Sequence, residues 1–226
     1  MDLENIQNNA IETYNRNLDY FKQSHTEIYK KIILLNEAIE LKAIKETYVL
    51  EYKNSYFEIN NQVTNQKYYG TNSLEFSKKM IEEQVNFNPR KNSFKTYYEF
   101  DVSQRQASNA LNSNVLSNFY NENSPFINFF KSKLPEKEEL KKIYKYIVLG
   151  TGLGLHIPLI HDKINALFYM IIEPNLEIFR LSLFVTDYSK IAQSSTLMFS
   201  VAQDESQFKE NFKFFLSHAY VFDNFI

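Results

Sequence analysis

Apolar side chains recur every three or four residues near the start of the chain, which predicts an amphipathic helix over residues 3–22. The positions that share this spacing are Ile6, Ala10, Ile11, Tyr14, Leu18 and Phe21. The segment "SHTE" follows, and Ser24 lies three residues before Glu27, which is the spacing of a capping box that opens a second helix. We therefore expect the N-terminal region to form a helical pair that packs on the rest of the chain.

The period of the pattern then changes from helical to alternating. "TYVLEYKNSYFEI" alternates aromatic or branched residues with polar ones on both sides of "KNS", which predicts a β-hairpin. "NSLE", from Asn72 to Glu75, is typical of a cap that starts a helix, and this helix runs to about Gln84. The Asn- and Ser-rich stretch that follows has few apolar positions, and we expect only a partial helix there, around Ala107 to Tyr120.

From Leu140 onward, short apolar runs alternate with segments of helical period. "KYIVLG", "ALFYMIIEP" and "STLMFSV" predict buried strands, and "LHIPLIHDK", "NLEIFRLSLF" and "ESQFKENFKFFLSHAYVF" predict helices. Strands that alternate with helices indicate βαβ units and a parallel sheet covered on both faces. The expected fold class is α/β, with a Rossmann-like parallel sheet in the C-terminal part, preceded by the N-terminal helical pair and the hairpin. We divide the chain into an N-terminal α+β subdomain, 1–135, and a Rossmann-like half domain, 136–226.

Composition excludes several classes of function. The 226 residues carry a net charge of −2, so no basic excess is present to neutralise nucleic-acid phosphates, and we expect no nucleic-acid partner. The chain contains no cysteine, which removes disulfides, thiolate nucleophiles and zinc–thiolate sites. The N-terminus has neither a basic nor an apolar leader region, and no apolar stretch is long enough to span a bilayer. These observations favour a cytoplasmic protein with no membrane span.

The candidate chemistry is concentrated in "VLGTGLGLHIPLIHDK". Three of the four glycines of the chain, Gly150, Gly152 and Gly154, alternate there, directly after the first predicted strand of the sheet. A turn at this place faces the crevice where doubly wound sheets bind ligands, and the helix after it directs free N–H groups at an anion. Glu173 follows Gly154 by 19 residues, where a carboxylate commonly binds ribose hydroxyls. Either this turn binds a nucleotide-type ligand, or its glycines serve tight packing between strand and helix.

His156 is the histidine nearest to this crevice, so it is a candidate ligand contact. His156 and His161 are five residues apart and fall on different faces of one helix, which is a poor arrangement for a metal pair. We expect no metal site, and no catalytic triad, nucleophile elbow or Walker loop can be read.

Four segments resemble one family when they are taken together in order. "NLDYFKQSHTEIYKKI", "YVLEYKNSYFEI", "KYIVLGTGLGLHIPLIHDKI" and "IIEPNLEIFRLSLFVTDY" look like the N-terminal region of the motility accessory factor proteins, which are related to MptE-like proteins. This resemblance implies a bacterial glycosyltransferase that attaches nonulosonic acids (pseudaminic or legionaminic acid) to flagellin. It also implies a longer protein with a central domain that binds the sugar nucleotide, a CMP-nonulosonate, so we expect this chain to be a fragment or a natural truncation. No catalytic residue of the family can be carried over, because its catalytic domain is not present.

Three hypotheses follow from these patterns. The chain is the non-catalytic N-terminal module of such a glycosyltransferase, with flagellin as a partner. Alternatively, it is a stand-alone Rossmann-like enzyme that binds a nucleotide or S-adenosylmethionine, because G-x-G-x-G is close to the nucleoside-binding turn of methyltransferases. The third alternative is a structural domain whose crevice holds no ligand.

Overall fold

The computed structural model describes residues 3–85, 87–94 and 142–218. Residues 1–85 and 142–226 form one compact unit, and 86–141 form another. The division of the chain predicted at residue 135 and the helix predicted around Ala107 to Tyr120 lie outside the described residues, and both stay predictions. The helices and strands of the first unit are α1 (Leu3–Ser24), α2 (Thr26–Glu40), β1 (Tyr48–Lys53), β2 (Tyr56–Asn61), α3 (Ser73–Gln84), β5 (Lys145–Leu149), α6 (His156–Ile164), β6 (Phe168–Glu173), α7 (Leu176–Ser182), α8 (Tyr188–Ile191), β7 (Thr196–Val201) and α9 (Glu205–Ser217).

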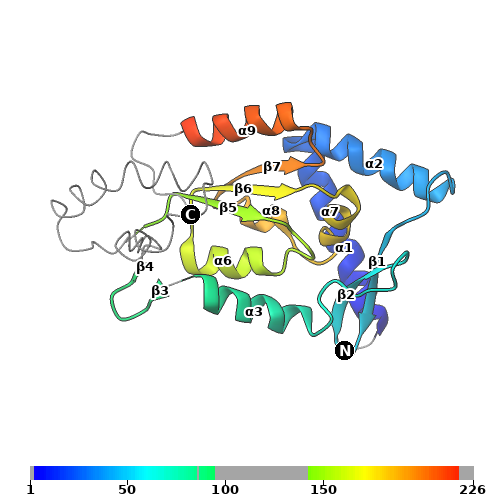
Figure 1. The fold of residues 1–226 in the computed structure, drawn as a ribbon, viewed down its shortest axis with the longest axis horizontal. Helices are drawn as coiled ribbons and strands as arrows, with labels where there is room; N and C mark the ends of the chain where they lie inside the picture. The colour runs from blue at the N-terminus through cyan, green and yellow to red at the C-terminus, as the bar shows by residue number, and fades with distance from the viewer. Residues whose placement is uncertain (1–2, 86, 95–141, 219–226) are drawn as a thin grey trace, which may run out of the picture. The chain divides into compact units, whose positions relative to one another are not determined.

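A three-stranded parallel sheet forms the centre of this unit. The strand order is β5-β6-β7, and both pairs are parallel, with Val148 opposite Ile171 and Ile171 opposite Phe199. Figure 1 shows α6, with α3 beyond it, on one side of the sheet and α9 on the other. Helix α6 connects β5 to β6, and α7 and α8 connect β6 to β7. The α/β class and the Rossmann-like parallel sheet are therefore confirmed.

The elements that precede the sheet also follow the predicted order. The hairpin β1–β2 is antiparallel, with Lys53 opposite Tyr56, and its turn residues Asn54 and Ser55 both have positive φ. This is the type I′ geometry that matches the twist of the two strands. Asn72 caps α3, since its side chain accepts hydrogen bonds from the amides of Leu74 and Glu75.

The capping box predicted at Ser24 is wrong. Ser24 is the last residue of α1, and the N-cap of α2 is His25, whose side chain makes no capping hydrogen bond. The two helices are separated by this single residue. The His25 ring packs instead against the Phe199 ring at 4.9 Å, and it is hydrogen-bonded to the Tyr20 hydroxyl at 3.0 Å. Packing against the sheet therefore decides the geometry of this junction.

An aromatic core joins the N-terminal helices to the sheet. Phe21 of α1 is fully buried, and its ring lies 4.9 Å from that of Phe199 and 5.6 Å from that of Phe179. Asn17, also fully buried, donates to the carbonyls of Leu183 and Thr186. Because aromatic pairs at these distances stabilise beyond their buried area, α1 is an integral part of the core.

In the second unit the described residues form an antiparallel pair, β3 (Phe87–Asn88) and β4 (Ser93–Phe94). Within the described ranges of the chain, no helix has both the length and the apolar character that crossing a bilayer requires.

Candidate functional site

The glycine-rich turn connects β5 to α6 at the carboxyl end of the sheet. Gly150, Gly152 and Gly154 have φ values of 80°, 49° and 74°. Each therefore adopts a left-handed conformation that residues with a Cβ rarely occupy, which explains the choice of glycine at all three positions. The structure places the candidate residues Glu173 and His156 at this turn as well, one at the end of β6 and the other at the start of α6.

The three glycines differ in what surrounds them. A Cβ on Gly150 would meet no atom within 4 Å, so this glycine faces open space. A Cβ on Gly152 would collide with the Tyr69 hydroxyl, and one on Gly154 would lie 2.8 Å from the hydroxyl oxygens of Thr186 and Tyr188. Protein side chains therefore fill the space beside Gly152 and Gly154, whereas in a ligand-binding turn a phosphate would lie there.

Hydrogen bonds within the chain occupy four amides of the turn. The Gly150 N–H donates to the Ile172 carbonyl, and the Gly154 N–H donates to the Thr151 carbonyl. The Thr151 N–H donates to Glu173 Oε2 at 2.8 Å. The fourth N–H, that of Leu153, donates to the Tyr69 hydroxyl oxygen at 2.7 Å. A side-chain carboxylate and a phenol therefore take the positions in which an anion would otherwise accept these bonds.

Both carboxylate oxygens of Glu173 accept hydrogen bonds. Oε2 accepts from the N–H and from the hydroxyl of Thr151, and Oε1 accepts from the Asn175 N–H at 2.9 Å. Its side chain is 4% exposed. This carboxylate, a candidate ligand contact from the sequence, fastens the turn to the end of β6.

Tyr69 and Glu58 also belong to this network, although no sequence pattern predicted a role for either residue. The buried carboxylate of Glu58 accepts hydrogen bonds from the amides of Ile59, Tyr69 and Gly70. It thereby holds the segment after the hairpin so that the Tyr69 hydroxyl reaches the turn. Burial is the main cause that raises the pKa of Tyr69, so the hydroxyl keeps its proton at neutral pH. The one signal in the sequence was the fourth glycine, Gly70, directly after two tyrosines.

His156 begins α6 and lies beside the turn. Burial lowers its pKa to about 4, against the opposing effect of a hydrogen bond with the Gly150 backbone, so the ring is neutral at pH 7. His161 is directed elsewhere: its ring nitrogens lie 3.1 Å from the Tyr169 hydroxyl oxygen and 3.0 Å from Ser194 Oγ. In the part of the chain that the structure describes, no three His, Cys, Asp or Glu side chains are grouped as metal ligands.

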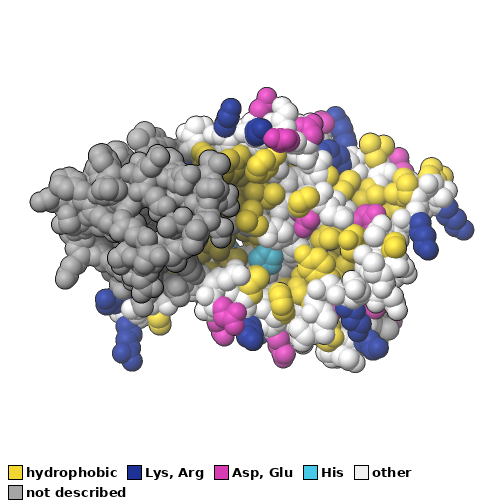
Figure 2. Space-filling view, viewed as in Figure 1, with side chains coloured by type: hydrophobic (Ala, Val, Ile, Leu, Met, Phe, Trp, Pro, Cys, Tyr) yellow, Lys and Arg dark blue, Asp and Glu magenta, His cyan; other side chains and the backbone are white. Residues whose placement is uncertain are grey.

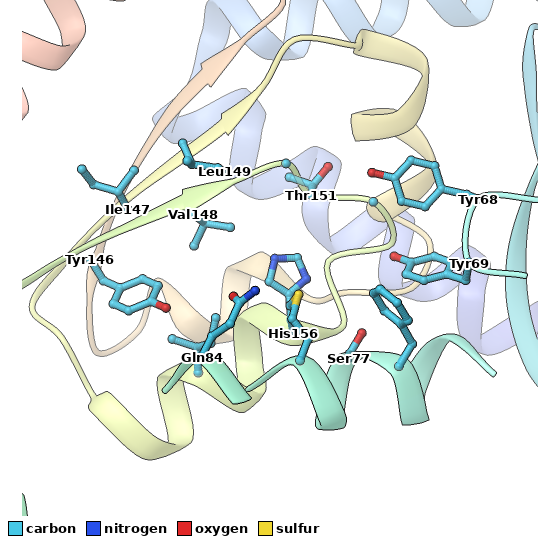
Figure 3. A pocket seen from close by; sticks show the side chains of 15 residues that line it. Tyr68, Tyr69, Ser77, Gln84, Tyr146, Ile147, Val148, Leu149, Thr151 and His156 are labelled. Atoms are coloured by element: carbon cyan, nitrogen blue, oxygen red, sulfur yellow. The ribbon is translucent and has the colours of Figure 1, made fainter. Parts of the chain in front are cut away.

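A cavity of about 390 Å³ opens along β5, between this strand, α3 and the start of α6 (Figure 3). Residues 146–149 of β5 line it on one side. The other lining residues include the aromatic and neutral polar side chains of Tyr68, Tyr69, Phe76 and Ser77, together with His156. None of the 15 lining residues is Lys, Arg, Asp or Glu. Figure 2 shows hydrophobic side chains around a histidine on the viewed face of the molecule. The site can therefore accept an uncharged ligand, and it offers no cation to a phosphate.

Comparisons with known proteins place the chain in a family. The model of the family described as the glycosyltransferase Maf N-terminal domain matches residues 13–224. Among solved structures, the fold is similar to that of the Maf glycosyltransferase from Magnetospirillum magneticum AMB-1, with 14% sequence identity and a TM-score of 0.55. The match covers 90% of this chain and 29% of that one, so the chain spans less than a third of the solved glycosyltransferase. No curated protein matches the sequence. The chain belongs to the family of Maf glycosyltransferase N-terminal domains.

Proposed function

We propose that this chain acts as the N-terminal module of a Maf-type glycosyltransferase that transfers a nonulosonic acid, pseudaminic or legionaminic acid, to flagellin. In this proposal the module positions the acceptor and does not catalyse transfer alone. The observation that carries it is the family match over residues 13–224, combined with coverage of 29% of a solved Maf glycosyltransferase.

The chemistry of the turn supports a role other than catalysis. A transferase needs an acid, a base or an orienting carboxylate within reach of the reacting atoms. Glu173 is buried and hydrogen-bonded at both oxygens, and His156 is uncharged at neutral pH. These two residues were the acid–base candidates of the turn, and the contacts of Glu173 are those of a structural residue.

Transfer by the isolated chain is the direct test. The purified chain is incubated with flagellin and a CMP-activated nonulosonate, and flagellin is analysed by intact-protein mass spectrometry, with a full-length Maf glycosyltransferase as the positive control. We expect flagellin to keep its mass with this chain and to gain the sugar with the full-length enzyme. Sugar transfer by the isolated chain would overturn the proposal.

The alternative, a stand-alone nucleotide- or S-adenosylmethionine-binding enzyme, receives less support from the geometry. The amides that would contact the ligand are bonded to Glu173 and Tyr69, and the cavity has no charged lining residue. Thermal unfolding of the chain with S-adenosylmethionine or CMP separates the two ideas. We expect no change of Tm, and a saturable rise of Tm with either compound would favour the alternative.

A further inference from the structure

One edge of the parallel sheet has main-chain groups that no neighbouring strand uses. Within the described residues, β5 pairs only with β6, so its other side is an edge. The Gly150 N–H and the Tyr144 carbonyl are bonded toward β6. Because main-chain groups alternate in direction along a strand, those of Ile147 and Leu149 point away from β6, toward the edge. This places two N–H and two carbonyl groups in a row.

The cavity described above lies along the same edge. Residues 146–152 line it on one side, and α3 lines it on the other, through Phe76, Ser77 and Met80. Leu149 at the rim is 78% exposed. A row of free main-chain groups beside a hollow with aromatic walls is the arrangement used by proteins that add an extended peptide to a sheet.

We propose that the β5 edge binds an extended, uncharged peptide segment, which pairs with Ile147 and Leu149 and places side chains in the adjoining cavity. This inference rests on the proposed function, in which a protein, flagellin, is the acceptor. The five residues of β5 span about 16 Å at about 3.3 Å per residue, so a segment of about five residues fits the edge.

The chemistry of the lining selects this occupant. A charged segment would lose its hydration without gaining an ionic partner, because the lining has no Lys, Arg, Asp or Glu. The neutral ring of His156 adds no charge at pH 7. A phosphate-bearing ligand is disfavoured for the same reason, whereas a peptide supplies the N–H and carbonyl groups that the edge requires.

A proline at the edge tests the pairing directly. Leu149→Pro removes an N–H that points away from β6, a position at which edge strands accept proline, so the sheet is retained. Leu149→Ala is the matched control, because it removes the same exposed side chain and keeps the N–H. The probes are fluorescein-labelled, overlapping 12-residue peptides that cover the flagellin encoded in the same genome, and binding is read by fluorescence anisotropy.

We expect at least one peptide with an uncharged centre to bind the wild-type chain. Leu149→Pro should weaken this binding by about tenfold, because one main-chain hydrogen bond is lost and a carbonyl of the peptide is left without its donor, and Leu149→Ala should change it less than about twofold. Binding that is equal in all three proteins, or no binding of any peptide, would overturn the proposal. A third result would also overturn it: light scattering shows that the wild-type chain is a dimer, Leu149→Pro is a monomer, and no peptide binds. A second copy of the chain would then occupy the edge.

A measurement on the wild-type chain covers the case in which the proline variant fails to fold. Amide hydrogen exchange followed by NMR should slow at Ile147 and Leu149 by at least about tenfold when the bound peptide is added. Unchanged exchange at both amides would refute pairing at this edge. These results are independent of the transfer assay, so sugar transfer by the isolated chain would overturn the module while leaving the edge interaction as measured.

Discussion

The hydrogen bond between Tyr69 and the glycine-rich turn gives the sharpest test of how the site is held. Tyr69→Phe removes one oxygen atom and keeps the ring. In the native chain this oxygen accepts the N–H of Leu153 at 2.7 Å. Leu153 is fully buried and packs in a cluster with Ile59, Ile178 and Leu181. The substitution therefore leaves a buried N–H without an acceptor.

The expected loss follows from that geometry. A buried donor left without its partner costs about 1–3 kcal/mol, and we take about 2 kcal/mol as the central value for the free energy of unfolding. For a domain of this size, a loss of about 2 kcal/mol lowers Tm by about 4–8 °C. The phenylalanine ring preserves the packing of Tyr69, so lost apolar contact adds little to this value.

The neighbouring residue provides the control. Tyr68 is 51% exposed, and its hydroxyl makes no hydrogen bond with any residue in the described ranges, so Tyr68→Phe should change Tm by about 1–2 °C at most. The assay is thermal unfolding followed by circular dichroism, with urea denaturation for the free energy. If Tyr69→Phe and Tyr68→Phe unfold at the same temperature, the Tyr69 hydroxyl does not support the turn, and our account of Gly152 is refuted.

Three further substitutions test other parts of the structure. Gly152→Ala should destabilise the fold by at least about 1 kcal/mol more than Gly150→Ala in urea denaturation, because both strain a positive φ but only the first collides with a side chain; equal losses would contradict this. Asn17→Ala should cost about 2–5 kcal/mol, since it leaves the buried carbonyls of Leu183 and Thr186 and the N–H of Tyr188 without partners, and a Tm within about 2 °C of wild type would count against it. The pKa of His156 falls from 6.5 unfolded to about 4 folded, so its contribution to stability is complete above pH 6.5 and is lost as the pH decreases toward 4. His156→Gln should therefore reduce the slope of the unfolding free energy against pH in that window, by the amount that corresponds to the uptake of about one proton on unfolding. An unchanged slope would refute the lowered pKa of His156.

The sequence predicted the elements with strong, local patterns. The strands β5, β6 and β7 and the helices α6 and α7 follow from apolar runs that alternate with helical period, and the cap at Asn72 follows from its spacing to Glu75. The short helix α8 was missed because four residues carry no periodic signal. Elements with a clear period were therefore predictable from the chain alone.

The contacts of the site were less predictable, because they join residues far apart in the sequence. Glu173 was placed correctly at the end of a strand, yet its partner is the Thr151 amide and the structure gives it an internal role. Tyr69 reaches the turn across 84 residues, and nothing in the local pattern around Tyr69 indicates that distance. Local periodicity specifies where an element lies but leaves open which side chain fills a turn.

The aromatic core has a consequence for the synthesis of the protein. Phe21 is synthesised before its partner Phe199, which follows about 180 residues later, and this interval takes about 10–35 seconds at ordinary ribosomal rates. During that interval the apolar face of the first helix has no sheet to cover it. The part of the aromatic core that joins α1 to the sheet can therefore form only after β7 has been synthesised.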